Sequence, residues 1–206
     1  MRLVVADTSP LNYLVLIGQV EILPALFERI FVPQTVQNEL RQNEAPESVR
    51  RWIAAPPSWL EIVPTEQANG DPELLRLDEG ERAAILLATQ IGADLLLIDD
   101  RDGVNVARSK GFAVTGTLGI LDLAATRGLI RLNEAVEHLK NTSFRYPRMC
   151  WTPCWLGIPR KESREIDGGR RHKVGWGKFA TGISCEIVQW RAAADEDGPY
   201  CFAVAL

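Results

Sequence analysis

Short apolar runs alternate with longer segments in which apolar residues recur every three or four positions, from the start of the chain to about residue 140. The apolar runs predict buried strands at 3–6, 30–32, 94–98 and 112–115, and a short edge strand at 59–63. The helical spacing predicts helices at 10–17, 20–28, 34–41, 46–55, 78–91, 101–110, 117–126 and 133–140, with a loop at 64–77. Strands that alternate with helices favour an α/β fold, a three-layer α/β/α sandwich with a mainly parallel sheet.

Several of these helices begin with residues that commonly start helices. Ser9 and Pro10 suit the N-cap and the first helical position. Asp78 and Glu81 have the spacing of a capping box, in which the two side chains bond each other's backbone N–H groups. Thr117 is the predicted N-cap of the helix at 117–126. These signals fix where the helices are expected to start.

The pattern changes after Tyr146. All four cysteines and four of the six tryptophans lie in residues 147–206, which show no sustained helical or strand period. We therefore predict a domain at 1–146 and an irregular, poorly ordered C-terminal tail at 147–206; a shift of reading frame after Tyr146 would explain such a composition. Cys150 and Cys154 have no spacing typical of a zinc site.

Composition narrows the function classes. The chain has 206 residues, 46% of them hydrophobic and 24% charged, which is typical of a globular protein with a substantial core. Its net charge of −4 argues against a simple nucleic-acid-binding module, since such modules neutralise phosphates with basic residues. We expect a cytoplasmic protein without contact to a membrane, because no apolar run is long enough to cross one and no signal peptide is recognisable.

Four acidic residues occupy positions that parallel α/β folds use for function. Asp7 and Asp99 each follow a core strand, and the carboxyl ends of parallel strands open into one crevice. Glu39 lies on the helix after the second strand, and Glu81 lies in the first turn of the helix that leads to the Asp99 strand. We expect these four side chains to meet, with Asp100 as the alternative to Asp99.

A group of carboxylates would bind a hard divalent cation. Mg²⁺ and Mn²⁺ favour oxygen ligands, and such ions activate water in phosphodiester cleavage without a histidine base. The two histidines, His138 and His172, lie outside the acidic pattern. Asp7, Glu39, Glu81 and Asp99 are therefore the predicted metal ligands and catalytic residues.

The ordered set of motifs resembles a PIN domain. The matching segments are Asp7-Thr8-Ser9-Pro10-Leu11, Glu39-Leu40, Leu77-Asp78-Glu79-Gly80-Glu81-Arg82-Ala83-Ala84-Ile85, Leu96-Leu97-Ile98-Asp99-Asp100 and Gly116-Thr117-Leu118-Gly119. They are most similar to the bacterial and archaeal PIN-like group related to toxin ribonucleases, over about residues 1–146.

The resemblance implies a PIN-like fold and Mg²⁺- or Mn²⁺-dependent cleavage of RNA. It further implies a small antitoxin protein as partner and a homodimer. It carries the four acids of the family onto Asp7, Glu39, Glu81 and Asp99, although many PIN domains have aspartate in the third place. Thr8 or Ser9 would lie beside the first acid and bind a metal-bound water. The tail after residue 146 departs from the family pattern.

Each acid also has a purely structural interpretation. Asp7 would help to begin a helix, Glu39 would be a solvated helix residue, Glu81 would only complete a capping box, and Asp99 or Asp100 would cap the helix at 101–110. The basic residues near the crevice would either contact RNA phosphates or be ordinary exposed helix charges: Arg82, Arg101, Arg108 and Lys110.

Two other functions compete with a ribonuclease toxin. One is a catalytically silent PIN-like module that binds RNA or protein. The other is a metal-dependent phosphatase or DNA nuclease with a similar crevice.

Overall fold

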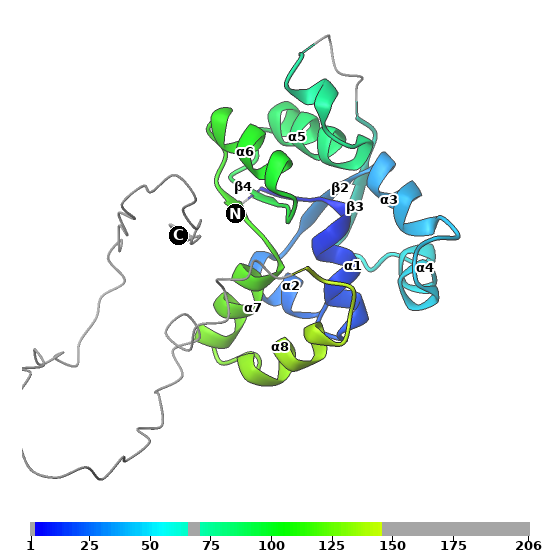
Figure 1. Ribbon diagram of the computed structural model, residues 1–206, viewed down its shortest axis with the longest axis vertical. Coiled ribbons are helices and arrows are strands. Elements are labelled where there is room, and N and C mark those ends of the chain that lie inside the picture. The colour runs from blue at the N-terminus through cyan, green and yellow to red at the C-terminus, as the bar shows by residue number, and fades with distance from the viewer. Residues whose placement is uncertain (1–2, 66–70, 146–206) are drawn as a thin grey trace, which may run out of the picture. The chain divides into compact units, whose positions relative to one another are not determined.

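The computed structural model describes residues 3–65 and 71–145, and within them a five-stranded parallel sheet forms the centre (Figure 1). The strands are β1 (Val4–Ala6), β2 (Ile30–Pro33), β3 (Leu60–Val63), β4 (Leu95–Leu97) and β5 (Val114–Thr115). Their order is β3-β2-β1-β4-β5, and every pairing is parallel. The predicted α/β/α fold with a parallel sheet is confirmed, and β3 is an edge strand as predicted.

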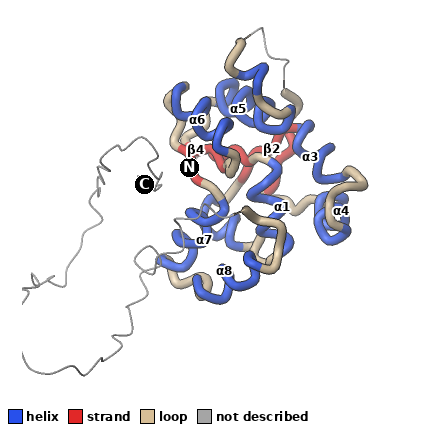
Figure 2. Tube along the Cα trace, in the orientation of Figure 1, coloured by secondary structure: helices blue, strands red, loops and turns tan. Residues whose placement is uncertain are grey.

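Helices connect successive strands, as Figure 2 shows. In chain order they are α1 (Thr8–Leu16), α2 (Ile22–Phe27), α3 (Gln34–Arg41), α4 (Glu47–Ala54), α5 (Glu79–Ile91), α6 (Arg101–Ser109), α7 (Thr117–Thr126) and α8 (Leu132–Lys140). A short 3₁₀ turn at Leu74–Arg76 lies inside the segment predicted as loop. None of the described helices combines the length and hydrophobicity that a membrane crossing requires.

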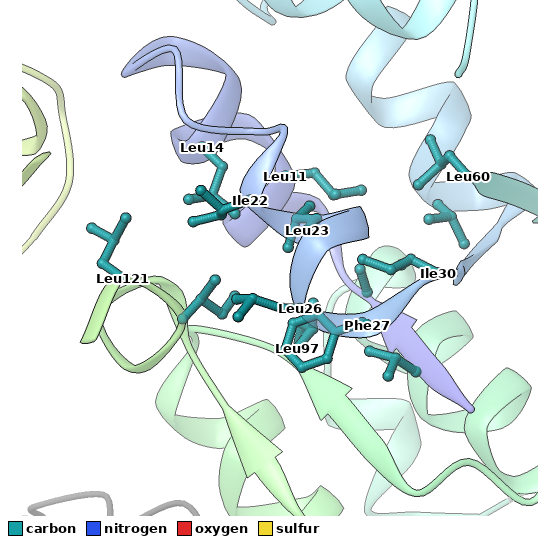
Figure 3. Close-up of a cluster of buried hydrophobic side chains, with 14 of the residues drawn as sticks. Leu11, Leu14, Ile22, Leu23, Leu26, Phe27, Ile30, Leu60, Leu97 and Leu121 are labelled. Carbon is teal, nitrogen blue, oxygen red and sulfur yellow. The ribbon is translucent and has the colours of Figure 1, made fainter. Parts of the chain in front are cut away.

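The sheet is buried on both faces because alternate side chains of its strands enter two separate cores. On β1, Val4 and Ala6 pack into a core with α1, α2, α3, α4, α7 and α8, part of which Figure 3 shows. Val5 points the other way, into a core with α5 and α6. Burial on both faces explains why β1 and β4 are continuous apolar runs rather than alternating ones.

Two helices begin at residues other than those that their capping signals suggest. Helix α1 starts at Thr8, so Asp7 takes the N-cap position and Pro10 is the third helical residue. Proline is tolerated there because N–H groups of the first turn have no partner inside the helix. Helix α7 has Gly116 at the N-cap position, and Thr117 is its first residue. The prediction of Ser9 and Thr117 as N-caps was wrong.

The segment 147–206 lies outside the described residues. The predicted domain boundary at residue 146 and the predicted irregular, poorly ordered tail therefore stay predictions, together with the frame-shift hypothesis. The interpretation of Cys150 and Cys154 falls on the same segment.

Candidate active site

The carboxyl edge of the sheet brings the ends of β1 and β4 together. Ala6 pairs with Leu97 in the parallel register, and the backbone N–H of Asp7 donates to the carbonyl of Leu97 at 2.9 Å. The strand order also reverses here, because β2 and β3 lie on one side of β1 while β4 and β5 lie on the other. Such a switch point is where open parallel sheets bind ligands.

Asp7 is the buried centre of this edge. Its side chain is only 3% exposed, and its Oδ1 atom has no hydrogen-bond partner. The pKa of Asp7 is raised to about 7, mainly by burial and also by the charges of Glu39 and Asp99, while the N–H groups of Thr8 and Ser9 oppose the rise. Asp7 makes no side-chain capping bond to α1. A role in starting the helix therefore does not account for the buried, unpartnered Oδ1 atom.

Glu39 approaches Asp7 from α3, which packs against α1 and α5. Its Oε2 atom accepts a hydrogen bond from the Thr8 hydroxyl. The carboxylate also lies directly against Gly80, where an added Cβ would overlap it and come within 2.8 Å of Oε1. Glu39 is therefore a fixed, partly buried residue rather than a solvated one.

Glu81 lies on the α5 side of the site. Its pKa is raised to about 8, mainly by burial and then by the charges of Asp100, Asp7 and Asp78, whereas a hydrogen bond from the backbone N–H of Asp78 opposes the rise. That bond is one half of the predicted capping box; the other half is missing, because the Asp78 side chain makes no capping bond. Glu81 thus both supports its helix and faces the other acids.

Asp99 and Asp100 have separate partners. Asp99 is partly buried: its Oδ1 accepts the backbone N–H of Thr117 at 2.8 Å, and its Oδ2 accepts the Thr117 hydroxyl at 2.6 Å. Burial raises the pKa of Asp99 to about 6, against the lowering effect of both Thr117 bonds. Asp100 is exposed and caps α6 by accepting the N–H of Asp102 at 2.8 Å.

Glu39, Glu81 and Asp99 therefore lie near Asp7, but the four acids are less close together than a ready-made metal cluster. Asp7 interacts electrostatically with Glu39, Asp99 and Glu81. Within residues 3–65 and 71–145, no three Asp, Glu, His or Cys side chains are placed so that they could hold one ion. Glu39 instead accepts a hydrogen bond from Thr8, and Asp99 accepts one from the Thr117 hydroxyl. The donor set still suits Mg²⁺ or Mn²⁺: every donor is a carboxylate oxygen, and one oxygen of Asp7 is unpartnered.

Sequence reasoning missed the residues that position these acids. It predicts Thr117 as a helix cap and Thr8 as a neighbour of bound water, whereas their hydroxyls bond the carboxylates of Asp99 and Glu39. Gly80 and Gly116 leave room for Glu39 and Asp99. A Gly-Thr pair after a predicted strand was the only available signal. Of the candidate phosphate contacts, Lys110 forms an ion pair with Asp71 at 2.5 Å.

A parallel α/β/α sandwich with acids near the carboxyl edge of its sheet belongs to the class of open α/β folds that bind ligands at that edge. A family model described as a PIN domain matches residues 3–153, so the chain belongs to the PIN-domain family. Proteins of this family are generally nucleases that use divalent metal ions, and RNA is the nucleic acid that the family implies. No curated protein matches the chain.

Proposed function

We propose that this protein is a divalent-metal-dependent endoribonuclease that works through Asp7, Glu39, Glu81 and Asp99. The observation that carries the proposal is the environment of Asp7. A buried carboxylate with one unpartnered oxygen, facing three further acids, is unfavourable unless protons or cations compensate the charge. A divalent cation is the compensation that also supplies chemistry.

Each of the four acids would hold Mg²⁺ or Mn²⁺. When bound, the ion would activate water for attack on a phosphodiester and stabilise the leaving oxygen. The chain's own contribution is positioning: Thr8 fixes Glu39, and Thr117 fixes Asp99. Because their pKa values are raised to about 7 and about 8, Asp7 and Glu81 would release protons when the cation binds.

The test compares the purified full chain with its Asp7→Asn variant on total RNA, with Mn²⁺ and with EDTA. We expect Mn²⁺-dependent cleavage that falls at least about 100-fold in Asp7→Asn, since an electrostatic contact to the reacting groups is lost. The matched control is Asp122→Asn, an exposed aspartate on α7, which should cleave like the wild type. Cleavage that persists in EDTA, or in Asp7→Asn, would contradict the proposal.

We further propose that the enzyme is the toxin of a toxin–antitoxin pair, acts in the cytoplasm as a homodimer, and is blocked by a small antitoxin. The similarity to PIN-like toxins supports this step. A short reading frame beside the gene should encode a protein that co-purifies with the chain and stops cleavage. Growth that continues normally when the chain is produced alone in an active form would contradict the toxin role.

A second candidate is a catalytically silent PIN-like module that binds RNA or protein. Two observations favour this module: Thr117 bonds both oxygens of Asp99, and the described residues contain no ready-made metal cluster. This candidate predicts RNA binding without cleavage in Mn²⁺, and equal binding by wild type and Asp7→Asn. The cleavage experiment therefore separates the two candidates.

A further inference from the structure

The start of helix α7 is built around the Asp99 carboxylate. Gly116 occupies the N-cap position, where Ser, Thr, Asp or Asn would normally accept an N–H of the first turn. Glycine has no side chain for this purpose, and Asp99 accepts the Thr117 N–H instead. An acid from the end of β4 thus replaces the missing cap of a helix that lies beyond both α6 and β5 in the chain.

Two features make this contact specific for Asp99. Thr117 is fully buried and gives both of its donors to one carboxylate, the N–H to Oδ1 and the hydroxyl to Oδ2. A Cβ added at Gly116 would overlap Oδ1 of Asp99 and lie 3.3 Å from the carbonyl oxygen of Ile98. Gly116 has φ −107° and ψ −175°, an extended conformation that alanine also adopts. Space for the carboxylate, rather than backbone freedom, is the visible requirement for glycine here.

We propose that Gly116 and Thr117 are positioning residues for the metal site: they fix the rotamer of Asp99 so that it faces Asp7. This inference rests on the proposed function, in which Asp99 is a metal ligand. Residues that orient a ligand in this way typically change metal affinity 10- to 100-fold when they are removed. A residue needed only for folding would change stability without such an effect.

The chain provides a matched control two residues away. Thr115 is 2% exposed, and its hydroxyl has no hydrogen-bond partner. Thr115→Val and Thr117→Val are therefore the same isosteric change at two buried threonines, one unbonded and one bonded to Asp99. Thr117→Ser keeps the hydroxyl and should restore what Thr117→Val loses.

The experiment measures Mn²⁺ binding by calorimetry in the full chain, without RNA, and the free energy of unfolding without metal. We expect Thr117→Val and Gly116→Ala to weaken Mn²⁺ binding about 10- to 100-fold. Thr117→Ser should stay within about threefold of the wild type, and Thr115→Val should bind Mn²⁺ as the wild type does. In the Asp99→Asn background, Thr117→Val should have little further effect on affinity, because the group that it positions has already changed.

Different results overturn different claims. If the wild type binds Mn²⁺ and Thr117→Val binds it equally well, the positioning role is wrong while the proposed nuclease stands. If Thr117→Val loses affinity by the same factor in the wild-type and in the Asp99→Asn background, the effect does not pass through the Asp99 carboxylate, and the inference again fails. If the wild type binds no Mn²⁺, the proposed function and the positioning role fall together. Should Thr117→Val not fold, Gly116→Ala decides by the same criteria.

Discussion

Asp7 and Asp99 follow neighbouring strands, and both belong to the same group of acids, yet their surroundings differ. Asp7 has a buried oxygen without a partner, and its pKa is raised to about 7. Asp99 receives two hydrogen bonds from Thr117, and its pKa is raised only to about 6. Burial is the largest cause of both shifts; the charges of Glu39 and Asp99 add to the rise at Asp7, whereas the two Thr117 bonds lower the pKa of Asp99. Asp7 has only the backbone N–H groups of Thr8 and Ser9 to oppose its rise in pKa, and its Oδ1 atom has no partner, so a cation would stabilise its charge more than that of Asp99.

The largest expected effect is a loss of stability as the pH rises in the absence of metal. Because Asp7, Glu81 and Asp99 have folded pKa values above their ordinary ones, the folded state keeps protons that the unfolded chain releases. Their stabilising contribution is complete below about pH 4 and is lost as the pH passes about 6 to 8. Between pH 5 and pH 8, the ionisation of Asp7 alone should lower the free energy of unfolding by about 2 to 3 kcal/mol.

Urea unfolding at several pH values measures this slope, and Asp7→Asn supplies its control. The variant should lose less stability over the same range, since an amide does not ionise. A wild-type protein whose stability is constant or rises from about pH 5 to about pH 8 would show that these acids are not desolvated as described.

Metal should reverse that loss. At about pH 7.5, Mn²⁺ at a hundred times its dissociation constant should raise the free energy of unfolding by about 2.7 kcal/mol. The gain should shrink at about pH 5, where Asp7 and Glu81 hold protons that compete with the cation. Thermal unfolding with and without Mn²⁺ measures the shift, with Ca²⁺ and EDTA as comparisons. Equal stabilisation of Asp7→Asn by Mn²⁺ would place the binding site elsewhere.

The contrast between the two aspartates can be measured directly in the metal-free protein at about pH 8. Asp7→Asn should stabilise the fold, because it removes a buried charge and breaks no good side-chain hydrogen bond. Asp99→Asn should stabilise it less, by a difference of at least about 1 kcal/mol, because it weakens two charge-assisted bonds to Thr117. If Asp99→Asn raised the free energy of unfolding more than Asp7→Asn does, the Thr117 bonds would not stabilise the Asp99 carboxylate as described.

The smallest expected effect on stability, with a clear effect on function, comes from Gly80→Ala. Alanine favours a helix over glycine by up to about 1 kcal/mol, but here its Cβ would overlap the Glu39 carboxylate. Stability should therefore change by less than about 1 kcal/mol while RNA cleavage falls about 10-fold or more. In the Glu39→Ala background, Gly80→Ala should only stabilise the fold, because the overlapping carboxylate is gone. Full activity in Gly80→Ala would show that Glu39 is free to move.

Several elements were predictable because their signals are local. The apolar runs that form β1 and β4, and the helical period of α5, follow from residues close together in the chain, and the structure confirms them. The start of α1 was misplaced, since Pro10 suits more than one position of a first turn. The 3₁₀ turn at Leu74–Arg76 has only Leu74 buried, which is too weak a pattern to recognise.

Local sequence patterns were enough to predict the layered parallel sheet and to place acids at the ends of two of its strands. Alternation of strand and helix, with strands apolar on both faces, has few other solutions. Tertiary contacts, in contrast, separate Asp99, whose charge acts on Asp7, from Asp100, which caps α6. They also place Thr8, Gly80, Gly116 and Thr117 against the carboxylates of Glu39 and Asp99. These contacts join segments far apart along the chain, so they depend on side-chain packing that no local spacing encodes.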